Sequence, residues 1–453
     1  MAKYEIKDGV GIIPEGTTEI EKNAFKGDRE LTSIVIPDSV TQIGESAFHF
    51  CENLTSITIP DSVTQIDKYA FCCCENLTHI NLPRQLKTIS MGTFASSGLT
   101  DIVIPDSVLT IRQNAFGGCK ALTSVVVSSS VTIIEENIFG AKERTQEGPH
   151  GSCPDLKSIV VAEGNKVFDS RDNCNAIIES DTNKLLFGCS TTVIPKSVKM
   201  IGASAFDGCA NLSNIDIPEG VDVIERVAFR GCEALHSISL PDSVKEIGGA
   251  AFLDCVNLTD LKLPQGITAI NPATFANCSS LTDIIIPETV TSIGFRAFAG
   301  CKSLKNTHIP NTVTKLEEYI FSGCSNLSEL TIPDSVKEIK KYAFYESGLS
   351  SIVIPKSVTA IGLCAFQYCN SLKEVTIMGA VKKLAHTFEQ CHSLETVTFG
   401  NKVKAVDDEV LGYCDTLKAI NVPSGMSDYY RQLLPSELHS LIVELPAEKK
   451  TKK

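Results

Sequence analysis

Residues 31–53 read LTSIVIPDSVTQIGESAFHFCEN, and variants of this pattern return along almost the whole chain. Its residue Phe48 belongs to a series of 15 phenylalanines, out of 20 in the chain, that recur every 22 or 23 residues within two runs. A fixed period of this length indicates a solenoid, in which each repeat buries its apolar face only against its neighbours. We call one repeat a rung and these residues the ladder phenylalanines. They are Phe25, Phe48, Phe71, Phe94, Phe116, Phe139, Phe206, Phe229, Phe252, Phe275, Phe298, Phe321, Phe344, Phe366 and Phe388.

Each rung reads as two strands and a corner. Leu31, Ile34 and Ile36 alternate as on a strand with one buried face, and Pro37 ends that strand because it has no N–H to donate. The β-branched segment at residues 40–43 predicts a second strand on the opposite face, and Gly44 after it suggests a turn with positive φ. The following Ser46-Ala47-Phe48, or its variant in other rungs, reads as one helical turn. The predicted fold class is α/β: a β-rich, right-handed superhelix with parallel sheets and short helical corners.

Composition excludes several classes of function. Hydrophobic residues make up 43% of the 453 residues, which is enough for a continuous core. A net charge of −13 argues against a nucleic-acid partner, since phosphate binding needs a cationic surface. No segment approaches the ~20 apolar residues of a membrane span. The first residues carry no apolar secretory signal, so either the protein stays inside the cell or the chain shown lacks its leader; read by sequence alone, the protein is cytoplasmic.

Cysteine follows the same period as phenylalanine. Twelve of the 18 cysteines lie three residues after a ladder phenylalanine or its substitute Leu411. Metal binding and disulfides are possible interpretations, but we favour a column of buried thiols that pack as small hydrophobes. Side chains that run parallel in successive rungs suit a disulfide poorly. The twelve are Cys51, Cys74, Cys119, Cys209, Cys232, Cys255, Cys278, Cys301, Cys324, Cys369, Cys391 and Cys414.

Asparagine precedes the first strand in several rungs, as at Asn53 and Asn76. The resulting Asn-Leu-Thr triplets match a glycosylation acceptor. We favour another role, in which the amide hydrogen-bonds the turn backbone between rungs.

The period breaks between Phe139 and Phe206. Residues 140–153 are polar and glycine-rich, and two apolar runs around residues 181–184 predict a β-hairpin. Cys174 and Cys189 would flank that hairpin, where a disulfide is an open alternative. We therefore divide the chain into N-terminal repeats (1–139), an irregular insert (140–190), C-terminal repeats (191–423), and a cap of two short helices with a basic tail (424–453).

These repeats resemble the BspA-like leucine-rich repeat family. The consensus Leu-Thr-Ser-Ile-x-Ile-Pro-Asp-Ser-Val-Thr-x-Ile-Gly-x-x-Ala-Phe-x-x-Cys covers about residues 9–423, and residues 172–179 of the insert are also similar to segments of that family. The resemblance implies a leucine-rich-repeat solenoid. It also implies a surface or secreted protein associated with adhesion to host proteins, in contrast to the cytoplasmic prediction.

The sequence contains no catalytic motif, and its histidines occupy different positions of the repeat. The most metal-like feature is the run Cys72–Cys74 with His79, but adjacent side chains on a helical corner would point in different directions, so we expect no zinc there. A metal-dependent hydrolase at the insert, built around His150, Cys153 and Cys174, is the enzymatic alternative. We predict that the protein is not an enzyme and has no cofactor, catalytic residue or metal.

The outward positions of the first strand are the predicted binding surface. In Leu-x-x-Ile-x-Ile, positions three and five should face solvent. They are small and partly apolar in the N-terminal repeats, as at Val35 and Val103, and acquire an acidic stripe in the middle of the chain. A solvated face that keeps the sheet soluble is the competing interpretation. The candidate partner-binding residues, placed on a concave sheet, are Asp216, Asp260, Lys262, Asp283, Ile285, His308 and Glu329.

The preferred function is a non-enzymatic, monomeric repeat protein that binds other proteins, in adhesion to host or extracellular-matrix proteins or in scaffolding. An intracellular structural scaffold or spacer without a specific partner is the alternative. The predicted structural ladder consists of Phe48, Phe71, Phe229, Phe252, Phe275, Phe298, Cys232, Cys255, Cys278 and Cys301.

Overall fold

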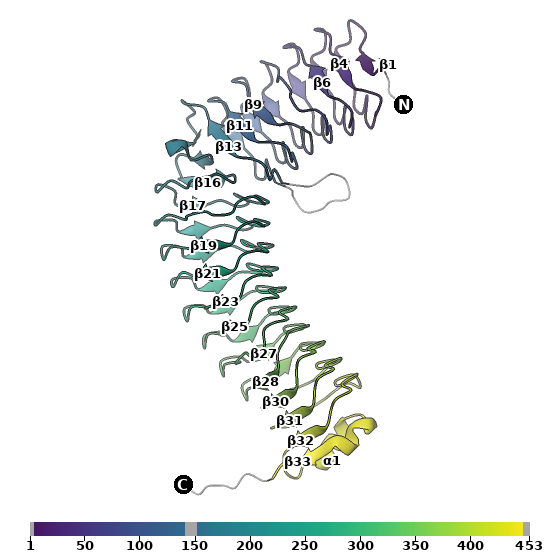
Figure 1. Cartoon of the computed structure of the whole chain (residues 1–453), viewed down its shortest axis with the longest axis vertical. Coiled ribbons are helices and arrows are strands. Elements are labelled where there is room, and N and C mark those ends of the chain that lie inside the picture. The colour runs from purple at the N-terminus through teal and green to yellow at the C-terminus, as the bar shows by residue number, and fades with distance from the viewer. Residues whose placement is uncertain (1–3, 141–151, 447–453) are drawn as a thin grey trace. The chain divides into compact units, whose positions relative to one another are not determined.

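The computed structural model describes residues 4–140 and 152–446, and the chain forms two compact units, Met1–Leu235 and His236–Lys453. Within each unit, short strands of successive rungs stack in parallel, as Figure 1 shows, and the predicted solenoid is confirmed. Most regular rungs contribute one strand to each of two series, which we call the first-strand and second-strand series. None of the helices in the described residues has the length and apolar character needed to cross a membrane.

The first unit holds strands β1 to β18. Pairing within the first-strand series gives the sheets β1-β2-β4-β6 and β9-β11-β13, whereas the second-strand series gives β3-β5-β7 and β8-β10-β12. The first-strand series and β1 comprise β1 (Glu5–Lys7), β2 (Val10–Ile12), β4 (Ser33–Val35), β6 (Ser56–Thr58), β9 (Asp101–Val103), β11 (Ser124–Val127) and β13 (Ser158–Val161). The second-strand series comprises β3 (Glu19–Ile20), β5 (Gln42–Ile43), β7 (Gln65–Ile66), β8 (Thr88–Ile89), β10 (Thr110–Ile111), β12 (Ile133–Ile134), β17 (Met200–Ile201) and β18 (Val223–Ile224).

The second unit repeats this arrangement. Its first-strand series is β19 (Ser237–Ser239), β21 (Asp260–Lys262), β23 (Asp283–Ile284), β25 (Asn306–Thr307), β28 (Ser351–Ile354), β30 (Glu374–Ile377), β31 (Thr396–Phe399) and β32 (Ala419–Val422). Its second-strand series is β20 (Glu246–Ile247), β22 (Ala269–Ile270), β24 (Ser292–Ile293), β26 (Lys315–Leu316), β27 (Glu338–Ile339) and β29 (Ala360–Ile361). Partners are in register one rung apart, so Ile238 pairs with Leu261 and Val375 with Val397.

The core of each rung is a stacked phenylalanine ring. Phe48 and Phe71 have ring centroids 5.2 Å apart with an interplanar angle of 3°, and Phe275 and Phe298 repeat the arrangement at 5.6 Å. Isoleucine and valine from both strand series surround these rings, and the ladder rings of both units are buried. The stack changes at the insert, where Phe139 meets Phe187 edge-on at 88°.

The corners are not helical, and this part of the prediction was wrong. Each is a run of turns in which two residues four apart, such as Ser46 (φ 56°) and Phe50 (φ 62°), adopt positive φ, which an α-helix excludes. Alternate N–H groups leave the corner and bond to the next rung: Ser46, Phe48 and Phe50 donate to the carbonyls of Lys68, Ala70 and Cys72. Contact with the next rung therefore replaces the intrahelical hydrogen bonds.

The glycine that follows the second strand has a different cause from the one expected. Gly294 and Gly362 do not have positive φ. A Cβ at Gly362 would lie 2.2 Å from the backbone nitrogen of Lys341, and one at Gly294 would lie 2.6 Å from that of Pro272. Close approach of the preceding rung, rather than a turn conformation, selects glycine at these two positions.

The insert contains the predicted hairpin and two elements that were not predicted. Strands β15 (Ile177–Glu179) and β16 (Lys184–Phe187) pair antiparallel, and β14 (Phe168–Asp169) adds to β15. A short 3-10 helix, η1 (Arg171–Asn173), lies between β14 and β15 in the chain. Strand β16 then pairs in parallel with β17, so the hairpin returns the chain to the second-strand series.

Both units carry an end structure. Strand β1 pairs antiparallel with β2, and Tyr4 stacks on Phe25 with centroids 5.4 Å apart. The other end has α1 (Ser427–Leu433) and the 3-10 helix η2 (Ser436–Leu441) (Figure 1). An additional strand, β33 (Ile442–Glu444), pairs with β32. Tyr430 of α1 is fully buried and stacks on Phe399 with centroids 4.7 Å apart, which closes this end of the core.

Candidate interaction surfaces

The outward positions of the Leu-x-x-Ile-x-Ile segments in the second unit form the surface that we call the acidic strand face, and three of its residues, Asp260, Lys262 and Asp283, lie in strands β21 and β23. It consists of Asp260, Lys262, Asp283, Ile285, His308 and Glu329, all exposed. The alternation arises because Leu261, Ile284 and Ile286 point into the core. Ile285 is 75% exposed, an unusual position for a large aliphatic side chain. The remaining predicted residue, Asp216, is exposed in the first unit.

Charges on the acidic strand face are only partly paired. The Asn306 amide donates to Asp283 over 3.1 Å, and His308 contacts Glu288 at 3.0 Å. Among the described residues, Asp260 and Glu329 have no ion-pair partner. Strands β21 and β23 contact each other in successive rungs, so the carboxylates of Asp260 and Asp283 project from adjacent strands. This face therefore offers negative charge beside an exposed isoleucine.

The same face of the first unit is partly apolar. Val103, Val126 and Val160 are paired across β9, β11 and β13. Val103 is 64% exposed and Val160 is 41% exposed. The two units thus present different chemistry at equivalent strand positions, as the sequence predicts.

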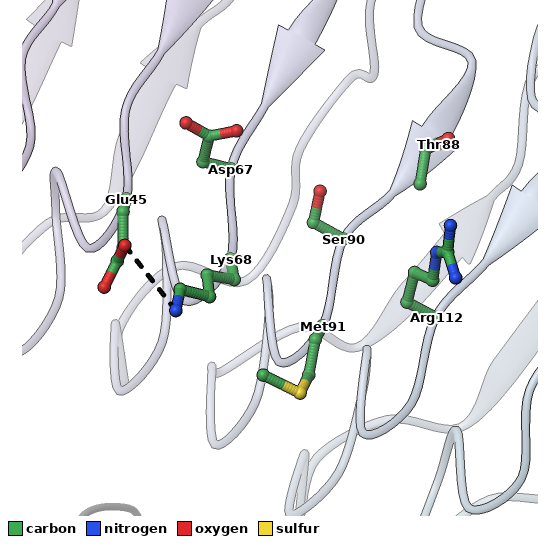
Figure 2. A pocket seen from close by; sticks show the side chains of 7 residues that line it. All are labelled: Glu45, Asp67, Lys68, Thr88, Ser90, Met91 and Arg112. Carbon is green, nitrogen blue, oxygen red and sulfur yellow. Dashed lines mark ion pairs between the residues drawn. The ribbon is translucent and has the colours of Figure 1, made fainter.

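A groove of about 470 Å³ lies in the first unit beside the second-strand series, shown in Figure 2. Glu45 and Lys68 face each other there at 3.6 Å, and Lys22 contacts the other oxygen of Glu45 at 3.1 Å. The hydrogen bond from Lys22 lowers the pKa of Glu45 below its ordinary value, so this carboxylate stays ionised and is a poor proton donor. The groove is lined by Glu45, Asp67, Lys68, Thr88, Ser90, Met91 and Arg112.

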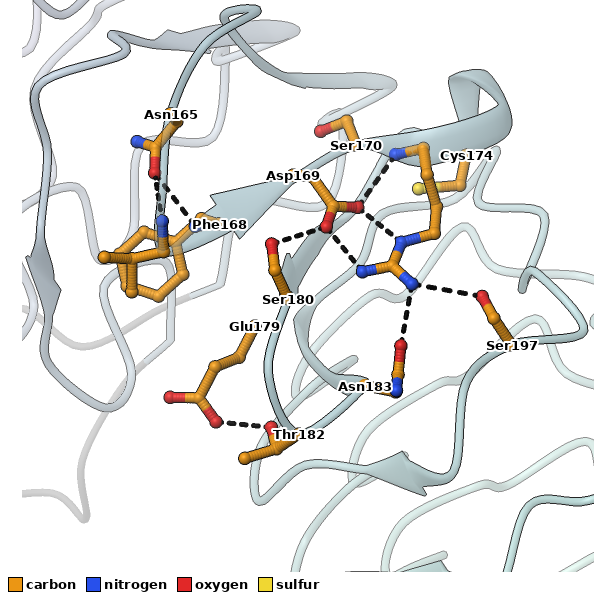
Figure 3. Close-up of polar contacts among 12 residues, drawn as sticks. Asn165, Phe168, Asp169, Ser170, Cys174, Glu179, Ser180, Thr182, Asn183 and Ser197 are labelled. Atoms are coloured by element: carbon orange, nitrogen blue, oxygen red, sulfur yellow. Dashed lines mark hydrogen bonds and ion pairs between the residues drawn. The ribbon is translucent and has the colours of Figure 1, made fainter.

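The insert is held by a polar network around Arg171. Its guanidinium donates to both oxygens of Asp169 and to Asn183 at 2.7 Å and Ser197 at 3.3 Å, and Figure 3 shows these partners together. Ser180 donates to the same carboxylate over 2.6 Å. These bonds tie η1 and the hairpin to the following rung and leave Arg171 engaged within the fold.

The cysteine column consists of free thiols that donate to backbone. Cys51, Cys278 and Cys301 each bond the carbonyl oxygen of the ladder phenylalanine one rung earlier, at 3.0, 3.2 and 3.1 Å. Burial raises the pKa of Cys51 and Cys301 to about 12, so these thiols are protonated and unreactive at neutral pH. The described cysteines are all free, including Cys174 and Cys189, which the sequence left open as a disulfide.

The side-chain amide of the periodic asparagine donates a hydrogen bond to the backbone of the preceding rung, which is the role that we favoured from the sequence. The amide of Asn53 donates to the carbonyl of Arg29 and that of Asn76 to the carbonyl of Glu52, each over 2.8 Å. These side chains are therefore part of the stack.

The enzymatic alternative at the insert gains no support from the residues that the structure describes. Cys153 donates to the carbonyl of Phe116, the same kind of bond that the column thiols make, and Cys174 donates to the carbonyl of Ala176. His150 lies outside the described residues.

The cysteine run is arranged differently from the expectation. His79 is exposed and contacts Asp101 at 3.2 Å, and Cys74 joins the thiol column. The thiols of Cys72 and Cys73 instead lie 3.4 Å apart and close to His49. One signal in the sequence could have found this: His49 and Cys72 each directly follow a ladder phenylalanine, so they occupy the same place in successive rungs.

Comparison with known proteins agrees with this architecture. The BspA type leucine rich repeat region matches in six copies over residues 18–145, 178–305 and 291–418. A solved leucine rich cell surface protein from Faecalibacterium prausnitzii is 34% identical, with 69% of this chain and 76% of that chain covered and a TM-score of 0.53. A leucine-rich repeat protein from Eubacterium ventriosum is 24% identical over 78% of this chain and 81% of that chain, with a TM-score of 0.51. The chain has no match among curated proteins. The repeat match and the Faecalibacterium relative together place the chain in the BspA-type leucine-rich repeat family.

Proposed function

We propose that this chain is a non-enzymatic adhesion protein that binds a basic protein partner at the cell surface. Leucine-rich repeat proteins generally bind other proteins and are typically non-catalytic, which supports the broad class. The cell-surface name of the Faecalibacterium relative supports the location. A host or extracellular-matrix protein is the partner class that fits such a location.

The acidic strand face carries this proposal. The side chains of Asp260 and Asp283 project from adjacent strands, and like charges this close repel each other. Lysine or arginine side chains of a partner would relieve that repulsion, and Ile285 beside them would add apolar contact. The apolar valines of the first unit are a second contact surface for the same partner class.

The direct test is charge reversal. A variant with Asp260→Lys, Asp283→Lys and Glu329→Lys is compared with the native protein for binding to immobilised matrix proteins by surface plasmon resonance. The matched control reverses Asp242, Glu246 and Asp334, which are exposed but lie in turns or in the second-strand series. We expect binding to fall at least tenfold in the first variant only, and native binding to weaken with added salt.

Two results would contradict the proposal. Equal loss in both triple variants would show that net charge, rather than this face, governs binding. Absence of saturable binding by the native protein would favour the structural spacer. Location is tested separately, by protease treatment of intact cells followed by detection of the chain, which should disappear if it is displayed outside.

A further inference from the structure

His49 is buried without a hydrogen-bond partner. Its side chain lies in the corner after Phe48, the residue is 6% exposed, and neither ring nitrogen has a partner among the described residues. The ring stacks on Phe50 with centroids 4.2 Å apart, which fixes its plane but satisfies neither nitrogen. An unpaired polar group in the interior carries a substantial desolvation cost, so such a group needs an explanation.

Two thiols lie beside this ring. Cys72 and Cys73 are 1% and 2% exposed, and their sulfur atoms are 3.4 Å apart. Positive φ at Cys73 (61°) interrupts the helical path that would have separated the two side chains. These cysteines are not part of the thiol column, which occupies the third position after the phenylalanine. The next rung has Ala95 and Ser96 at the two places, so the repeat itself does not require sulfur there.

The imidazole and both thiols form one potential ligand set. Their donor atoms all lie within 4.8 Å of one another, and no other group of three or more such side chains is found in residues 4–140 and 152–446. We propose that His49, Cys72 and Cys73 bind a zinc ion. The histidine comes from one rung and both cysteines from the next, so the ion would cross-link two rungs of the first unit.

The donor chemistry selects zinc among common ions. Thiolate and imidazole are its preferred ligands, and they discriminate against magnesium and calcium. Binding releases one proton from each thiol, so Zn²⁺ with two thiolates and a neutral imidazole carries no net charge. That balance suits a buried site better than Cu⁺, which would leave one negative charge. Zn–S bonds of ~2.3 Å in a tetrahedron place the two sulfurs about 3.8 Å apart, so they need to separate only slightly. A water molecule or an outside ligand would complete the four-coordinate ion.

The test measures metal content and coordination in the full-length protein. Protein stripped with a chelator is titrated with Zn²⁺, and bound metal is counted by elemental analysis after desalting. Cobalt(II) replaces zinc in a parallel titration, because thiolate coordination gives it a charge-transfer absorption. The test variant Cys72→Ala/Cys73→Ser copies the residues of the next rung, which should preserve folding. His49→Phe replaces the imidazole with an apolar ring, and Cys278→Ala removes a column thiol as the matched control.

We expect one zinc per native chain, a thiolate-to-cobalt absorption band, and retention of both in Cys278→Ala. The double variant should lose zinc and the band, and His49→Phe should weaken zinc binding at least tenfold. Equal zinc uptake by the native protein and the double variant would overturn the proposal. So would the lack of stoichiometric binding by the native chain, or stoichiometric binding of Cu⁺ alone.

Discussion

The thiol of Cys278 donates a hydrogen bond to the backbone carbonyl oxygen of Phe252, 3.2 Å away in the preceding rung. Several other rungs repeat this bond, so the column thiol has two roles: it fills a small apolar space and it satisfies a buried acceptor. Alanine could fill most of the space but could not donate. The bond gives a physical reason for cysteine at a position where any small apolar residue would fit.

Replacement of Cys278 tests these two roles. Cys278→Ala should lower the free energy of unfolding by about 1–3 kcal/mol, because it leaves a buried carbonyl with one partner fewer and opens a small cavity. Cys278→Ser should cost less, since its hydroxyl keeps a donor. Urea denaturation followed by circular dichroism measures both. A serine variant less stable than the alanine variant would show that the bond contributes little.

Phe252→Ala should destabilise the second unit by about 3–5 kcal/mol, because it removes a fully buried ring from the stack. Phe252 and Phe275 have centroids 5.7 Å apart, so the cavity would open directly against the next ring. The control is Phe295→Ala, at a phenylalanine that is 41% exposed, where the cost should stay below about 1 kcal/mol. Similar denaturation midpoints for the two variants would mean that the stacked ring is not a major source of stability.

His386 should make stability depend on pH. Its Nδ1 lies 2.8 Å from Glu389, and this hydrogen bond, together with the nearby Asp407, raises the pKa of His386 above the ordinary value of about 6.5. A raised pKa in the folded state means that the contribution is complete below pH ~6.5 and is lost as pH rises through the folded-state pKa. The melting temperature of the native protein should therefore fall more between pH 6 and 8 than that of His386→Gln. Parallel curves would contradict this. The effect should be small, since the side chain is 40% exposed.

Asp169 should act in the opposite direction. Burial raises the pKa of this carboxyl, but hydrogen bonds from Arg171 and Ser180 outweigh it, and the pKa lies below its ordinary value. The contribution to stability is present above the unfolded pKa of about 3.9 and is lost as pH falls through the folded-state value. After correction for the slower intrinsic exchange of amides in acid, the protection of residues 168–187 against hydrogen exchange should fall at acidic pH in the native protein. Asp169→Asn should be less protected at pH 6 and less sensitive to acid, and identical exchange profiles would refute this role.

The period predicted the rungs and their strands because the same apolar positions recur and must pack against their own copies. It did not predict the corners. Ser46 and Phe50 adopt positive φ because their N–H groups reach the next rung, and a contact across 22 residues leaves no local signature in the sequence. Likewise Gly362 is selected by the nearness of Lys341, which propensity alone cannot reveal.

Of the candidate sites, one was predictable from the sequence and one was not. Exposure of Asp260 and Ile285 followed from strand alternation, since a period of two fixes which side chains leave the core. The sequence analysis considered His79 as the histidine beside Cys72, because it is nearer along the chain. In the structure His49, from the preceding rung, lies beside Cys72, and His79 contacts Asp101. Comparing positions by repeat register, instead of by distance along the chain, would have identified it. The division into repeats, insert and cap stays a prediction.

The corner bonds all run one way. Ser46, Phe48 and Phe50 donate forward, and Ala250, Phe252 and Asp254 do the same in the second unit. Each regular rung of the described residues thus offers corner N–H donors to the rung that follows and corner carbonyl acceptors to the rung that precedes it. A gene duplication or deletion that spans a whole repeat would leave the corner donors of each rung opposite the acceptors of the next. A partial one would leave donors and acceptors without partners. Recombination can therefore change the number of rungs, and with it the length of the solenoid, while the contacts between rungs stay the same.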